Sequence, residues 1–98
     1  MTNGTTSTGF VFQFDETALD DMRLIDALGE SVDTSKGEIG QVMAISKLLT
    51  LLIGAEQKDR LYAHIGARHE NGRVPAMELR AELDDMVRQA GQDNAIKN

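Results

Sequence analysis

Apolar residues recur every three or four positions along most of the chain, which is the spacing of amphipathic helices. The pattern predicts four helices, over residues 16–28, 35–53, 55–68 and 75–91. Gly29 is expected to end the first helix. The stripe of that helix expected to be buried consists of Leu19, Met22, Ile25 and Leu28.

The second predicted helix contains the most apolar stretch of the chain, residues 48–53. Because apolar residues there cover nearly every direction around the helix, it is expected to be surrounded by protein. It either forms the central element, or buries one face internally and offers another to a partner. Gly54 is expected to separate it from the third helix. A membrane span needs roughly 20 apolar residues, so no membrane association is predicted.

The two ends of the chain lack a helical pattern. Residues 1–9 are a polar, low-complexity run that predicts a disordered tail, and residues 92–98 are expected to be frayed. Residues 10–14 alternate, with three Phe on one side, which predicts a short strand. A lone strand has nothing to pair with in a helical domain, so it pairs with a second copy or a partner, or packs as an extended segment.

The predicted fold is therefore mainly α. We expect a single helical domain over residues 10–91, a small bundle of about four helices with a short N-terminal β-strand or extended segment. Four methionines after Met1 lie on helical stripes, where they are expected in the core although thioethers also suit promiscuous binding surfaces. They are Met22, Met43, Met77 and Met86.

The formal net charge of −6 is concentrated in one segment. Residues 15–33 hold seven acidic residues against the single base Arg23, and seven minus one equals the whole net charge. An acidic chain without a basic stripe is a poor candidate for binding nucleic acid. A basic protein partner and a merely solvated acidic face both fit this segment. No signal peptide is recognisable after Met1, so a cytoplasmic location is expected.

Few residues suggest chemistry. The absence of cysteine excludes disulfides, thiolate–metal sites and cysteine nucleophiles. His64 and His69 are five residues apart, whereas zinc-binding pairs on a helix sit four apart. No pair of carboxylates predicts the desolvated cleft that general acid–base catalysis needs. We therefore expect no enzyme activity, no catalytic residue, no cofactor and no metal.

Residues 67–78 partly match a calcium-binding EF-hand loop. Asn71, Gly72 and Glu78 fall on a ligand position, the sharp-turn glycine and the bidentate acid. Ala67 and His69 stand where two further oxygen ligands belong. A degenerate EF-hand-like calcium-sensing module is therefore an alternative, and a turn joining two helices is the simpler interpretation.

The order of these features resembles the small tail assembly chaperones of long-tailed bacteriophages and prophages. The likeness covers about residues 10–88, and two blocks carry most of it: Leu-Leu-Ile-Gly-Ala-Glu-Gln at 51–57 and Asn-Gly-Arg-Val-Pro at 71–75. The resemblance implies a non-catalytic protein in the host bacterial cytoplasm. It would bind the tape measure protein and keep it soluble until tail tube subunits polymerise around it, with the tail tube protein a further candidate partner. A generic helical adaptor is a second alternative.

A protein that shields amphipathic helices needs exposed apolar surface. We hypothesise that apolar faces of the second and fourth predicted helices contact the client. Self-association is also open, through pairing of the strand at residues 10–14. The candidate partner-binding residues are Leu48, Leu51, Leu52, Leu79, Leu83 and Met86.

Overall fold

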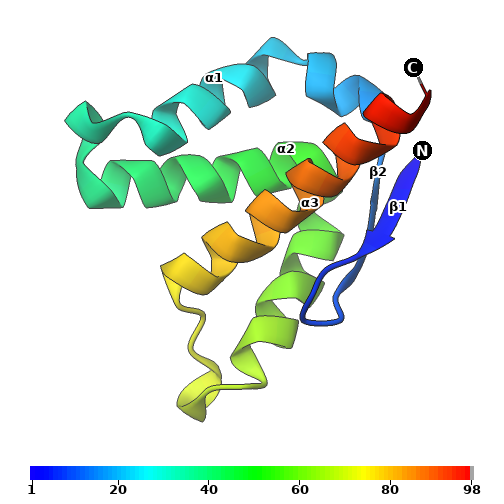
Figure 1. Cartoon of the computed structure of the whole chain (residues 1–98). Helices are drawn as coiled ribbons and strands as arrows, with labels where there is room; N and C mark the ends of the chain where they lie inside the picture. Colours follow the sequence, from blue (N-terminus) through cyan, green and yellow to red (C-terminus); the bar gives the residue numbers. More distant parts are fainter. Residues whose placement is uncertain (98) are drawn as a thin grey trace.

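The computed structural model describes the backbone of residues 1–97 and the side chains of residues 1–91. Three long helices and a two-stranded sheet make up most of it (Figure 1). The mainly α class is confirmed, with three long helices in place of about four. In chain order the strands and helices are β1 (Thr2–Thr5), β2 (Val11–Phe14), α1 (Met22–Val32), α2 (Gly37–Gly66) and α3 (Ala76–Lys97).

The N-terminal run forms the first strand of a hairpin. β1 pairs antiparallel with β2, from Thr2 opposite Phe14 to Thr5 opposite Val11. The predicted disordered tail over residues 1–9 is therefore wrong, and the strand at residues 10–14 needs no second copy to pair with. The composition of residues 1–9 did not reveal β1, because this strand is held by backbone hydrogen bonds and contributes little apolar surface.

The α2 helix contains one break, at Gly54. Its φ of 82° and ψ of 162° lie in a region that residues with a Cβ avoid. The predicted boundary at Gly54 is thus present, as a bend inside one element. The part of α2 before Gly54 runs antiparallel to α1, and the part after it turns away toward the loop that leads to α3 (Figure 1).

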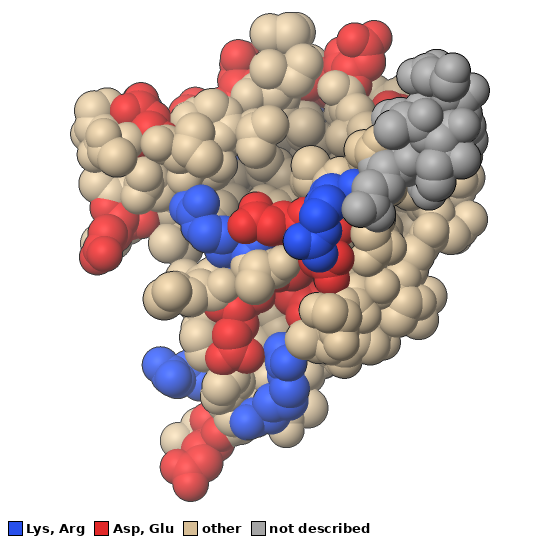
Figure 2. Space-filling model, viewed as in Figure 1, with Lys and Arg blue, Asp and Glu red and all other residues tan. Residues whose placement is uncertain are grey.

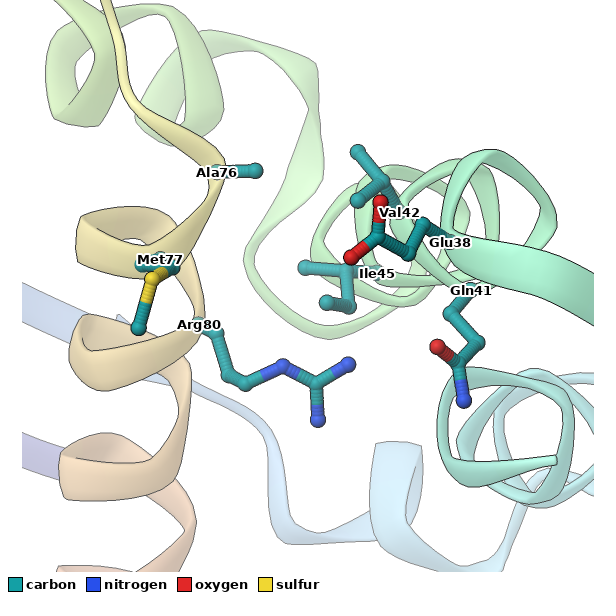
Figure 3. Close-up of a pocket in the computed structure, with 7 residues that line it drawn as sticks. All are labelled: Glu38, Gln41, Val42, Ile45, Ala76, Met77 and Arg80. Carbon is teal, nitrogen blue, oxygen red and sulfur yellow. The ribbon is translucent and has the colours of Figure 1, made fainter. Parts of the chain in front are cut away.

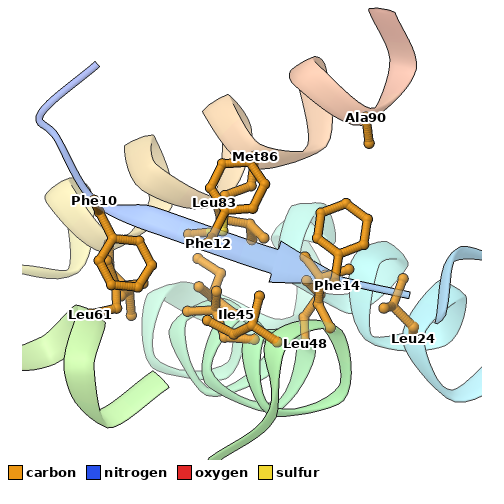
Figure 4. Packing of buried hydrophobic residues seen from close by; sticks show 14 of the residues in the cluster. Phe10, Phe12, Phe14, Leu24, Ile45, Leu48, Leu61, Leu83, Met86 and Ala90 are labelled. Carbon is orange, nitrogen blue, oxygen red and sulfur yellow. The ribbon is translucent and has the colours of Figure 1, made fainter. Parts of the chain in front are cut away.

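The hydrophobic core lies where the hairpin, α2 and α3 meet. Phe12 and Phe14 point inward from β2, and Phe10 precedes the strand on the same side (Figure 4). Leu48, Leu49, Leu52 and Ile53 are all buried, so this part of α2 is central to the core, which is the first of the two interpretations left open above.

Residues Thr34–Gly66 are long and apolar enough, by length and composition alone, to cross a membrane. A core helix passes the same test, and the buried Leu48, Leu49, Leu52 and Ile53 account for much of this hydropathy. Only 33% of the apolar window is buried, because its early turns expose Ile39, Val42 and Met43.

The face of α1 that packs inward differs from the predicted one. Leu24, Ala27 and Ser31 are buried, whereas Met22, Ile25 and Leu28 are 61%, 40% and 42% exposed. The difference arises at the start of the helix. Residues Glu16–Asp20 form a 3-10 turn, and the side chain of Asp21 caps α1 by accepting the N–H of Arg23. The α-helix therefore begins at Met22. Leu19 lies in the preceding turn and does not continue the helical spacing of Met22, Ile25 and Leu28.

Two predicted helix ends are also wrong. Gly29 lies inside α1, which continues to Val32, and Gly91 lies inside α3, which continues to Lys97. A glycine costs a helix interior only about 1 kcal/mol, which flanking turns can offset. The side chains of residues 92–98, where fraying is predicted, lie outside the described part of the chain.

We predict that Gly54→Ala lowers the free energy of unfolding by about 1–3 kcal/mol, because alanine is strained at this positive φ. Gly29→Ala is the matched control. It is exposed in a regular helix with open space around it, so it should stabilise by about 0.5–1 kcal/mol. Urea denaturation measures both. Equal stability of the Gly54→Ala variant and the parent chain would show that the break imposes no strain.

Candidate partner-binding groove

The six candidate partner-binding residues lie mostly in the core. Five are between 0% and 4% exposed, and Leu51 is half-buried and packs against the same core. These side chains hold the fold together and cannot contact a partner in this conformation. Their burial contradicts the hypothesis that these faces are available to a client. The residues concerned are Leu48, Leu51, Leu52, Leu79, Leu83 and Met86.

A different set of apolar side chains reaches the surface of the helices. They come from the flank of α1, the first turns of α2, and α3. Three of the four methionines expected in the core belong to this set, and only Met86 is buried. The exposed side chains are Met22, Ile25, Leu28, Val32, Ile39, Val42, Met43, Met77 and Val87.

Several of these residues line two adjoining cavities beside α3. The first, of about 310 Å³, lies between the start of α2 and the start of α3 (Figure 3). Its apolar walls are Val42, Ala76 and Met77. The second, of about 240 Å³, lies between the end of α1 and the middle of α3.

The walls of the second cavity include Leu28, Val32 and Val87, with Leu83 beneath them. Ile45 and Arg80 line both cavities, so the two lie next to each other. We call the pair of cavities the α1–α3 groove. Its floor is the core itself, since Ile45 is 1% and Leu83 3% exposed.

Arg80 lies at the centre of the groove. Its Nη2 donates a hydrogen bond of 2.9 Å to the backbone oxygen of Ser31, which ties α3 to the end of α1. Glu38 and Asp84 also line the groove, as does Arg88, whose Nη2 lies 2.8 Å from Asp85 Oδ1. Acidic and basic groups meet in the middle of this face, while acidic groups gather along its α1 edge (Figure 2).

A polar cluster clamps the hairpin turn onto α2 and α3. The hydroxyl of Thr8 donates to Glu82 Oε1 and lies 3.0 Å from His64 Nε2. A hydroxyl nucleophile would have to give its proton to the histidine. Here the Thr8 hydroxyl donates its hydrogen bond to the Glu82 carboxylate instead, so the imidazole of His64 must be the donor to Thr8. This geometry holds the turn in place and does not activate the hydroxyl.

Asp85 completes the clamp. It accepts from Gln89 Nε2 at 3.1 Å, from the backbone N–H of Ser7 at 2.7 Å and from Arg88. These hydrogen bonds, led by that of Gln89, lower the pKa of the Asp85 carboxyl. Both Glu82 and Asp85 are buried, and the sequence interpretation missed them. Their signal was their spacing, because both lie on the apolar face of α3 with Leu83 and Met86.

In the EF-hand-like segment, residues 67–78, the acid that would bind calcium already contacts basic side chains of the same segment. Glu78, which would close a calcium loop, lies 3.3 Å from Arg68 Nη2 and 2.5 Å from His69 Nε2. The described side chains contain no group of three His, Asp or Glu that could hold a metal ion. His64 and His69 are each half-buried and make separate contacts, one with the hairpin turn and one with α3.

Comparisons of the chain with protein-family models, with curated proteins and with solved structures found no match.

We predict that Asp85→Asn destabilises the chain by about 1–3 kcal/mol at pH 7, since a charged acceptor of several hydrogen bonds is lost. Asp84→Asn, the exposed neighbour, is the control and should change stability by less than about 0.5 kcal/mol. Thermal unfolding monitored by circular dichroism measures both variants.

The effect of Asp85 should depend on pH. Its pKa is lowered in the folded state, so its stabilising contribution is present above the unfolded value of about 3.9. As the pH falls through the folded pKa, that contribution is lost, and the stability of the parent chain should converge on that of Asp85→Asn. A gap that stays constant from pH 7 to about pH 2 would contradict this account.

Proposed function

We propose that this chain is a non-catalytic tail assembly chaperone whose α1–α3 groove binds amphipathic helices of the tape measure protein. The observation that carries the proposal is the groove itself, with apolar walls supplied by Leu28, Val32, Val42, Met77 and Val87. An amphipathic client helix would bury its apolar face there and leave its polar face in water.

The charge distribution supports this role. A protein that displays apolar side chains to a client must itself stay soluble, and net charge away from zero opposes self-association. The acidic segment at residues 15–33 carries the whole net charge of −6 and lies along α1, at the edge of the groove. A client that binds beside it would enter a soluble complex.

The resemblance to tail assembly chaperones supplies the identity of the client. The two blocks that carry it, residues 51–57 and 71–75, lie at the break in α2 and in the loop before α3. Both positions set the direction in which α3 leaves α2, and so shape the groove. The tape measure protein is the proposed partner, with the tail tube protein as a second candidate.

Co-expression with a tape measure protein from the genome that encodes this chain tests the proposal. We expect the parent chain to raise the soluble fraction of the tape measure protein and to co-purify with it. Val32→Asp and Met77→Asp should each abolish both effects, because a charge at either wall must be desolvated when an apolar client binds.

Val11→Asp is the matched control, since Val11 is 63% exposed on β2 and lies outside the groove. All three variants should fold with stabilities within about 1 kcal/mol of the parent, because their side chains are exposed. Unchanged solubility of the tape measure protein with the parent chain, or equal activity of all three variants, would refute the proposal.

A further inference from the structure

We propose that the α1–α3 groove recognises a helix with two apolar anchor residues seven positions apart and a carboxylate between them, and that Arg80 binds this carboxylate. The inference rests on the proposed function, since it defines the chemistry of the client at the same groove.

The cavities follow one another along the helix. Met77 lines the first and Asp84 the second, and Arg80 lines both. Met77 and Asp84 are seven residues apart, which is two helical turns or about 10 Å. A client helix lying along α3 can therefore fill both cavities with apolar side chains at positions i and i+7. Its residues at i+3 and i+4 would then face Arg80.

Arg80 has unused hydrogen-bonding capacity at this point. Its one hydrogen bond goes to the neutral backbone oxygen of Ser31, whereas a guanidinium has five N–H donors. Within residues 1–91, no carboxylate lies within ion-pair distance of Arg80, although the chain is acidic overall. The half-buried guanidinium of Arg80 therefore makes no ion pair in this part of the chain, although Glu38 and Asp84 line the same groove.

A bound helix would raise the free-energy cost of leaving the Arg80 guanidinium without an ion pair. Apolar anchors on both sides of Arg80 would displace water from the guanidinium, and an unpaired charge is strongly disfavoured where water is excluded. A client that supplies a carboxylate removes this penalty and gains charge-assisted hydrogen bonds, because the planar guanidinium fork matches carboxylate geometry. A client with lysine at that position would add repulsion to the penalty.

Two carboxylates of the chain lie close enough to compete. Glu38 lines the first cavity from α2, and Asp84 follows Arg80 by one turn. Figure 3 shows the Arg80 side chain extending across the cavity from α3 toward Gln41, while the Glu38 carboxylate lies beside Val42. Neither acid is paired with Arg80, so the site stays open to a carboxylate from outside.

A displayed library of helical peptides tests the inference. Each peptide of about fifteen residues carries leucine at i and i+7, with glutamate, glutamine or lysine at i+3 and i+4, and is selected against the full chain. We expect glutamate to be enriched about tenfold or more over glutamine, and lysine to be depleted. Arg80→Glu should invert the preference to lysine, and Arg80→Gln should abolish the distinction between glutamate and glutamine.

Arg73→Glu is the matched control, because it makes the same charge change at an exposed position outside the groove. It should retain the preference for glutamate, as should Glu38→Gln, and circular dichroism verifies that every variant folds. A glutamate preference that survives Arg80→Glu, or no peptide selected at all, would overturn the inference.

The same reagents separate this inference from the proposed function. If the chain solubilises the tape measure protein but shows no Arg80-dependent peptide preference, the carboxylate rule is wrong and the chaperone role stands. If the peptide preference follows Arg80 but the tape measure protein gains nothing, the groove is a helix-binding site for another client.

Discussion

The break at Gly54 determines which surfaces of this molecule are covered. Before it, α2 lies against α1, and after it the helix turns away, so that α3 returns across α2 and beside the hairpin. In a regular bundle the last helix would lie along α1 and bury its apolar flank. Here α3 packs on α2 and β1 instead, which leaves Leu28 and Val32 as one wall of a groove.

The apolar residues that form the core are different from the exposed apolar residues that are available to a partner. Its core is closed by three phenylalanines from the hairpin, which the clamp around Glu82 and Asp85 fixes to α2 and α3. Apolar side chains outside this core cluster on α1, the start of α2 and α3. Charged substitutions at the exposed walls Val32 and Met77 therefore test binding with little effect on folding, whereas substitutions at the buried Leu83 or Met86 would change both.

Much of the helical framework could be predicted because it depends on local patterns. The apolar run at residues 48–53, the boundary at Gly54 and the helix beginning near residue 75 all follow from periodicity and from glycine conformation. β1 could not be predicted in this way, because a strand of four mostly polar residues has no hydrophobic alternation. It is stabilised by pairing with β2 and by contacts with α3, which are tertiary interactions.

The sequence did not predict which apolar side chains line the groove, nor that α1 contributes to it. An apolar stripe looks the same in sequence whether it faces a core or a client, so Leu79 and Leu83 could not be distinguished from Met77. The prediction of the buried face of α1 was wrong for a local reason, because the cap at Asp21 starts the helix later than the apolar pattern does. The role of Arg80 depends on the distance between α1 and α3, which no single-sequence pattern reports.

The most direct test of the account is a titration of the full chain with the tape measure protein, monitored by methyl-resolved NMR. Binding in the groove predicts shifts concentrated at the methyl groups of Leu28, Val32, Val42, Met77 and Val87, with those of Val11 unchanged. Shifts centred on Val11 and the hairpin, with the groove methyl groups unaffected, would contradict it.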